Sequence, residues 1–222
     1  MKLELQFFGG RGSSSSLPMN NTPGGGGGGG PEGDLDQQPG LSRSAAEALG
    51  ERGRPMSTYN AVNGANPNFE MGEEYQYNCQ RCIIATEARF RGYDVQALPT
   101  HNGDTMPTGN NYLNNFVGAT SSGINHTTAG ANKRDVESQM SNMGNGSRAV
   151  MSFGWSGGDG HVINVVQRNG RTRYYDGQNG TEVNGTALFN AMARRSLITL
   201  TRVDNLAFSD TVNQAIRPTV GR

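Results

Sequence analysis

One short turn restricts the fold of this chain more than any other feature, because Asn169-Gly170 joins two strand-like runs. An Asn-Gly pair in that setting is the strongest short-range signal for a two-residue β-turn, since both residues tolerate positive φ. A turn of this kind places His161 opposite Gln178 and makes Asp176 its diagonal neighbour, about 7–8 Å away on the same face. The sequence therefore predicts a histidine that is oriented by an acid.

A helix precedes this hairpin in the sequence and is predicted over residues 79–91. Asn78 is a suitable N-cap, Glu87 and Arg91 form an i, i+4 pair in the favourable order, and Gly92 stands where a helix commonly ends. Strands are expected at residues 94–98, 148–153, 161–167, 171–176 and 197–203, and helices at 112–117, 134–143 and 186–195. A helical segment followed by a mostly antiparallel sheet predicts the α+β class.

The first quarter of the chain has a different composition, with an unbroken glycine run over residues 24–30. Glycine loses the most backbone entropy on ordering and offers no side chain to bury, so such a run does not fold alone. We expect a disordered arm rich in Gly, Ser and Pro at residues 1–55, with a helical turn or two over 44–49. One catalytic domain at 56–206 and a loosely held tail at 207–222 complete the predicted organisation.

Charge and hydropathy exclude several classes of partner. The chain has 19 basic and 19 acidic residues, so no global field attracts nucleic acid or an anionic membrane. Its opening residues lack the apolar core and cleavage site of a secretory signal, and no apolar run is long enough to span a bilayer. These features predict a cytoplasmic protein without classical export.

The two cysteines, Cys79 and Cys82, carry the remaining chemistry. A thiol with its free pKa of about 8.5 becomes a good nucleophile only beside positive charge or a helix N-terminus. Cys79 is at the predicted helix start, so the helix and His161 could both stabilise its thiolate. A metal site made of both cysteines, His161 and a fourth ligand is the competing chemistry.

These motifs together resemble the papain-fold toxin or glutamine-deamidase domains of bacterial polymorphic toxins and prophage head proteins. The resemblance covers about 130 of the 222 residues and includes the segments 78–95, 160–165 and 175–180. It implies a papain-like fold with a catalytic helix packed on the sheet, and a family order of Cys, His and Asp. On these positions it implies Cys79 as nucleophile, His161 as base and Asp176 as orienting acid, with Gln178 in a supporting role.

One departure leaves the identity of the nucleophile open. In papain a glutamine six residues before the nucleophile contributes to the oxyanion hole, and here Gln76 lies six residues before Cys82. That spacing favours Cys82, whereas the helix start and the Asn-Cys motif of the toxin branch favour Cys79. We prefer Cys79 and expect Cys82 to pack against the sheet.

The resemblance implies a thiol hydrolase that needs no cofactor or metal and acts on a protein carboxamide, most simply as a glutamine deamidase of toxin type. A papain-like peptidase is the first alternative. The second is a non-enzymatic phage head-associated protein that retains the fold. Expected partners are a protein substrate, phage head or portal proteins and an immunity protein, in a bacterial cytoplasm or on a virion.

Overall fold

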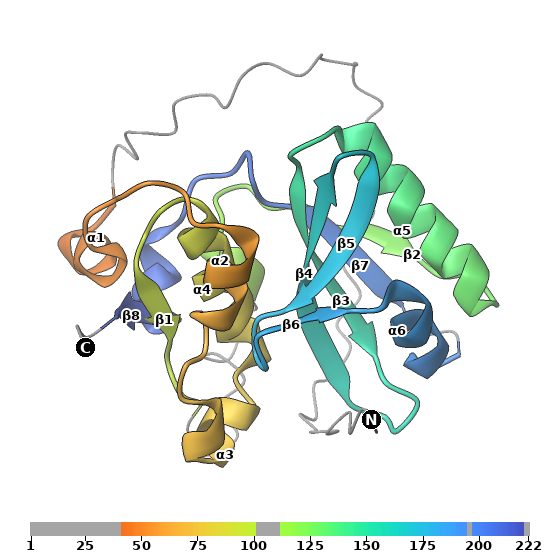
Figure 1. The fold of residues 1–222 in the computed structure, drawn as a ribbon, viewed down its shortest axis with the longest axis horizontal. Helices are drawn as coiled ribbons and strands as arrows, with labels where there is room; N and C mark the ends of the chain where they lie inside the picture. The colour runs from red at the N-terminus through yellow and green to blue at the C-terminus, as the bar shows by residue number, and fades with distance from the viewer. Residues whose placement is uncertain (1–40, 101–111, 195–196, 220–222) are drawn as a thin grey trace.

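The computed structural model describes residues 41–100, 112–194 and 197–219 (Figure 1). The helices are α1 (Arg43–Leu49), α2 (Thr58–Asn63), α3 (Glu73–Gln76), α4 (Cys79–Phe90), α5 (Ala129–Met143) and α6 (Gly185–Ala191), and the 3₁₀ turns are η1 (Phe69–Met71), η2 (Tyr112–Asn115) and η3 (Asp210–Gln214). The strands are β1 (Val95–Ala97), β2 (Ser122–Ile124), β3 (Arg148–Gly154), β4 (Gly160–Arg168), β5 (Arg171–Asp176), β6 (Thr181–Val183), β7 (Ile198–Arg202) and β8 (Ile216–Pro218).

Six of these strands form one antiparallel sheet in the order β2-β7-β3-β4-β5-β6, and β1 pairs with β8 separately. Figure 1 shows α1 to α4 on one side of the larger sheet and α5 and α6 on the other. Helices and antiparallel strands are thus combined in the α+β, papain-like arrangement that the sequence predicts.

The predicted hairpin is present with the predicted register. Asn169 and Gly170 have φ values of 52° and 71°, as a two-residue turn with two positive φ angles requires. In the ladder that follows, Asn164 lies opposite Tyr175. Side-chain alternation from that pair brings His161 and Asp176 to the same face, at the end of the hairpin away from the turn.

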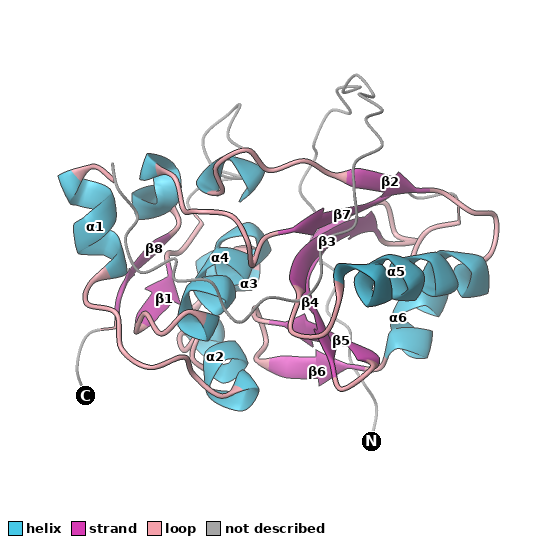
Figure 2. Ribbon diagram, turned by 90° about the horizontal axis from the view of Figure 1, so that it is seen from above, coloured by secondary structure: helices cyan, strands magenta, loops and turns pink. Residues whose placement is uncertain are grey.

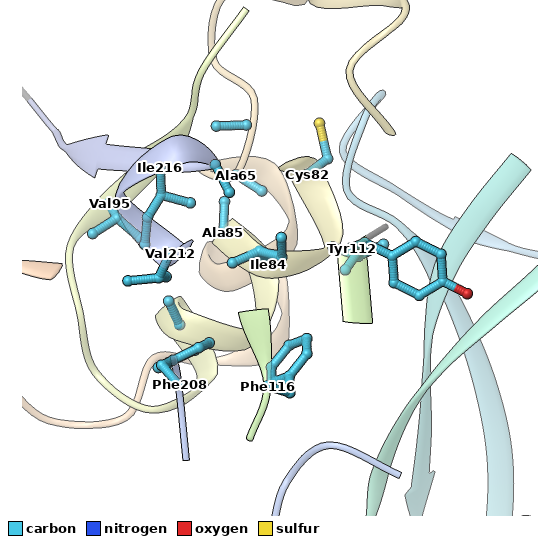
Figure 3. Close-up of a cluster of buried hydrophobic side chains, with 14 of the residues drawn as sticks. Ala65, Cys82, Ile84, Ala85, Val95, Tyr112, Phe116, Phe208, Val212 and Ile216 are labelled. Atoms are coloured by element: carbon cyan, nitrogen blue, oxygen red, sulfur yellow. The ribbon is translucent and has the colours of Figure 1, made fainter. Parts of the chain in front are cut away.

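Helix α4 is the central element of the first core. Every residue from Arg81 to Phe90 is buried, because α2, β1 and the sheet surround this helix. Its apolar side chains Ile83 and Ile84 join Val150 and Val162 of the sheet in one cluster. Figure 3 shows Ile84 and Ala85 of this cluster facing Val212 and Ile216 from the end of the chain.

A second core covers the opposite face of the sheet. Met151, Ile163 and Val165 point to that side because they alternate with the residues that face α4. Helix α5 contributes Met140 and helix α6 contributes Leu188. Figure 2, viewed at right angles to Figure 1, shows these two helices together on their side of the sheet.

A buried carboxylate fixes α4 to the sheet. The Glu87 side chain has no exposed area and accepts hydrogen bonds from Arg91 Nε at 2.8 Å and from Arg148 Nε at 2.8 Å. Arg148 begins β3, and Arg91 also donates to the carbonyls of Val203 and Leu206, just after β7. Burial alone would raise the pKa of Glu87, but the two arginines outweigh it and the pKa lies below its ordinary value.

The structure departs from the expected arm and tail in two places. The helical turn predicted over 44–49 is present as α1, but it packs into the core through Ala45 and Leu49, while residues 1–40 lie outside the described part of the chain. Within the expected tail, Val212 and Ile216 are fully or almost fully buried. Both segments are too short to show a long apolar period in the sequence. In the structure they contact each other through α1 and η3.

Some predicted elements differ in extent. Helix α5 begins at Ala129, earlier than predicted, because Thr128 caps it by accepting a hydrogen bond from the backbone N–H of Ala131. Helix α6 ends at Ala191, earlier than predicted, because Met192 is extended and bridges to Trp155. The segment predicted as a helix over 112–117 is the 3₁₀ turn η2.

We predict that Glu87→Gln lowers the free energy of unfolding by about 3–5 kcal/mol at pH 7, because it leaves two arginines without their buried counter-charge. The ordinary pKa of 4.5 is lowered in the folded chain, so the ionised carboxylate stabilises the fold fully above pH 4.5. That contribution is lost as the pH falls through the folded pKa. Urea denaturation should therefore give a difference in the free energy of unfolding between wild type and variant that is constant above pH 4.5. This difference should shrink on further acidification.

The matched control is Glu47→Gln, whose ion pair with Arg43 has side chains 64% and 92% exposed. An exposed i, i+4 pair contributes little, so this variant should stay within about 0.5 kcal/mol of wild type. Equal losses of unfolding free energy in the two variants would contradict the claim that Glu87 fixes α4 to the sheet.

Candidate active site

Cys79 is the first residue of α4 and is only partly buried. The first N–H groups of a helix have no partner within it, and the helix dipole favours negative charge at this end. Cys79 therefore combines access from outside with an electrostatic setting that suits a thiolate. This is the position that the sequence predicts for the nucleophile.

Cys82, one turn further along α4, has a different environment. Its side chain is 0% exposed and lies beside Ala65 and Ala85 in the first core (Figure 3). Its Sγ donates to Asn78 Oδ1 at 3.0 Å, and burial, followed by the charges of Cys79 and Asp176, raises the pKa of this thiol. The geometry favours Cys79 over Cys82 as the reactive thiol.

The side chain of Gln76, whose spacing suggested Cys82, bonds to a backbone carbonyl in the segment before α3. Its Nε2 donates to the backbone carbonyl of Phe69 at 3.3 Å. The backbone carbonyl of Gln76 accepts a hydrogen bond from Gln178 Nε2. The side chain holds the turn between η1 and α3 together. The spacing argument for Cys82 therefore finds no support in the contacts of Gln76.

The predicted capping role of Asn78 is wrong. Asn78 stands at the N-cap position, but its side chain makes no capping hydrogen bond. It is 1% exposed and its Nδ2 instead donates to the carbonyl of Leu98 at 3.1 Å and to Asn66 Oδ1 at 3.3 Å. Distant partners compete successfully for this amide, which a local reading of the sequence does not anticipate.

His161 and Asp176 are in contact, as the hairpin register predicts. His161 Nε2 lies 3.0 Å from Asp176 Oδ2, and the side chains are 10% and 11% exposed. Cys79 also raises the pKa of His161, so its side chain lies close to the ring. The structure thus brings together Cys79, His161 and Asp176, from α4, β4 and β5.

The charge on His161 follows from these neighbours. Burial of the ring opposes protonation and would lower its pKa. The charge and hydrogen bond of Asp176, with a smaller contribution from Cys79, outweigh burial and raise the pKa from 6.5 to about 10. The imidazole is therefore protonated at neutral pH, and a cation beside a thiol favours the thiolate.

Two aromatic side chains hold the imidazole ring in place. Trp155 stacks on it at 5.8 Å between centroids with an interplanar angle of 25°, and Phe153 meets it edge-on at 5.8 Å. An indole face within about 6 Å attracts a cation, so the stack suits a protonated ring. Trp155 is 7% exposed and lines the site beside His161.

The turn after β5 holds the carboxylate of Asp176. Its Oδ1 accepts from the backbone N–H of Gln178 at 3.0 Å, and its Oδ2 accepts from Asn179 Nδ2 at 3.2 Å. Gly177 lets this turn approach α4, because a Cβ there would lie 2.3 Å from Thr86 Oγ1. Gln178 thus supports the acid through its backbone, and Asn179 is a contact that the sequence analysis missed.

Among the residues that the structure describes, no group of three or more His, Cys, Asp or Glu side chains is arranged to hold a metal ion. None of the helices in the described part of the chain is long and apolar enough to cross a membrane.

Comparison with known proteins finds one match. Residues 77–181 match the family model described as papain fold toxin 1, glutamine deamidase. The matched segment contains all three residues of the Cys79–His161–Asp176 group. No curated protein and no solved structure matches the chain. The family match confirms the predicted resemblance to papain-fold glutamine deamidase domains and supports a thiol hydrolase of the deamidase kind.

We predict that iodoacetamide labels Cys79 and spares Cys82 in the folded protein at pH 7, because Cys82 is fully buried and its pKa is raised. Peptide mass mapping before and after unfolding in urea separates the two sites. In His161→Ala the labelling of Cys79 at pH 6 should fall at least about tenfold, since the stabilising cation is gone. Preferential labelling of Cys82 in the folded state would overturn the assignment.

Proposed function

From the match of residues 77–181 to the papain-fold glutamine deamidase family model, we propose that this protein deamidates glutamine side chains of a target protein. The observation that carries the proposal is the contact of His161 with both Asp176 and Cys79 at the start of α4. These are the groups that nucleophilic hydrolysis of an amide requires: a thiolate, a proton donor and an acid that orients it.

In the first step, the Cys79 sulfur attacks the carbonyl carbon of the substrate carboxamide. The oxygen gains negative charge, and the positive end of the α4 dipole, where Cys79 lies, favours that charge. His161 gives its proton to the amide nitrogen, the carbon–nitrogen bond breaks and ammonia leaves. A thioester between the substrate and Cys79 remains.

In the second step, His161 is neutral and accepts a proton from water, which attacks the thioester carbon. The carbon–sulfur bond breaks, and the thiolate and the imidazolium are restored. The side chain is released as a carboxylic acid, which gives its proton to solvent or ammonia and becomes glutamate. Asp176 keeps the ring in one orientation through its bond to Nε2 during both transfers. Trp155 and Phe153 limit the movement of the ring and exclude water from its faces.

Deamidation and peptide cleavage use the same groups and differ in the bond that breaks. The family description names a glutamine deamidase, so the side-chain amide is our first choice and peptidase activity is the alternative. The same description names toxins, and we extend the proposal to a toxin role in which modification of the target disables it.

The proposal predicts that the purified protein converts glutamine to glutamate in a bacterial protein extract without cutting the chain. Reaction in water enriched in heavy oxygen, followed by tryptic mass spectrometry, should place the heavy atom in glutamate side chains. Cys79→Ala should abolish this incorporation, since the thioester cannot form.

Cys82→Ala is the matched control, because it removes a buried thiol from the same helix and leaves Cys79 in place. It should retain incorporation apart from any loss of stability. Heavy oxygen at new chain ends would instead show a peptidase. Equal incorporation by wild type and Cys79→Ala would contradict the proposed nucleophile.

A further inference from the structure

The residues of the site come from separate elements of the fold. Contacts between these elements must therefore hold the residues at a fixed distance. Cys79 follows the segment that contains α3, whereas Asp176 precedes the turn that leaves β5. A small misplacement of a catalytic group can cost about 10²-fold in rate, so the connection between these segments matters for chemistry.

Asn66 lies between the two segments. It follows α2, outside the part of the chain that the family model matches, and is 6% exposed. Its Nδ2 donates to the carbonyl of Tyr75 at 2.8 Å, on the nucleophile side, and to the carbonyl of Gln178 at 2.9 Å, on the acid side. One amide group thus spans the gap with both of its hydrogens.

A second amide spans the same gap in the opposite direction. Gln178 Nε2 donates to the carbonyl of Gln76 at 2.6 Å, and the backbone N–H of Gln178 donates to Asp176 Oδ1 at 3.0 Å. Asn66 also pairs with the Asn78 amide at 3.3 Å, and Asn78 Oδ1 accepts from the Cys82 thiol. A continuous hydrogen-bonded chain therefore runs from the first turn of α4 to the carboxylate that holds His161.

We propose that Asn66 and Gln178 form a carboxamide clamp, a pair of positioning residues that sets the distance between the Cys79 helix start and the Asp176 turn. The clamp bonds to the segment before Cys79 and to the Asp176 turn, and it acts through Asp176. When it is opened, the acid turn moves away from α4, the Asp176–His161 contact weakens and the imidazole loses its proton more easily. This inference rests on the proposed function, because it assigns a role within the same site.

The test is the pH profile of Cys79 alkylation by iodoacetamide in the full chain, measured for wild type, Asn66→Ala, Gln178→Ala and His161→Ala. In both clamp variants we expect the rate at pH 6 to fall about tenfold relative to wild type, with a smaller fall at pH 9. Asn132→Ala is the matched control, since Asn132 is also 6% exposed and ties its side chain to the His126 backbone at the start of α5. Its profile should match wild type within about twofold, whatever stability it loses.

The outcomes separate the two proposals. A changed profile in His161→Ala with wild-type profiles in both clamp variants overturns the clamp alone. A wild-type profile in His161→Ala overturns the thiol–imidazole pair and the clamp with it. If Asn66→Ala shows no cooperative thermal transition, the Gln178→Ala profile decides, because that variant removes the second tie across the same gap.

Discussion

The buried carboxylate of Glu87 is the interaction around which this fold is organised. It accepts hydrogen bonds from Arg148 at the start of β3 and from Arg91 just after α4, and Arg91 continues to the carbonyls that follow β7. A single carboxylate thus fixes the helix against the sheet. Because a helix is rigid and rises 1.5 Å per residue, fixing Glu87 also fixes Cys79, about 12 Å away at the other end.

The other half of the site is fixed by strand pairing. The Asn169-Gly170 turn sets the register of β4 and β5, and that register brings His161 within 3.0 Å of Asp176. A slip by one residue would turn one of these side chains to the opposite face of the sheet. The site is therefore the meeting point of a helix held by buried charge and a hairpin held by its turn.

The sequence predicts the parts of this architecture that local rules govern. The hairpin register, the start of α4 and the contact of His161 with Asp176 follow from turn chemistry and periodicity and are present in the structure. Contacts between distant segments are not predictable in this way. Asn78 was expected to cap α4, yet its amide bonds to Asn66 and Leu98, because buried partners compete with the local backbone.

The same limit explains why the packing of α1 and of the last segment was not predicted, and why some residues of the site were missed. The segments containing Ala45 and Ile216 look like parts of a linker and a tail because each has few apolar residues, yet each is buried by packing against the other parts of the core. Asn66 lies in a polar stretch before Pro67 and resembles an ordinary turn residue. Only the folded arrangement shows that its amide spans two segments of the site.

The central claim is that His161 rests as an imidazolium between Asp176 and Cys79. Titration of the histidine rings by NMR, with the His161 signal assigned by its loss in His161→Ala, tests this directly. The account predicts that His161 keeps its proton through neutral pH and loses it only near pH 10. A ring that titrates near its ordinary value of 6.5 would contradict it, because the thiol would then have no cation beside it at neutral pH.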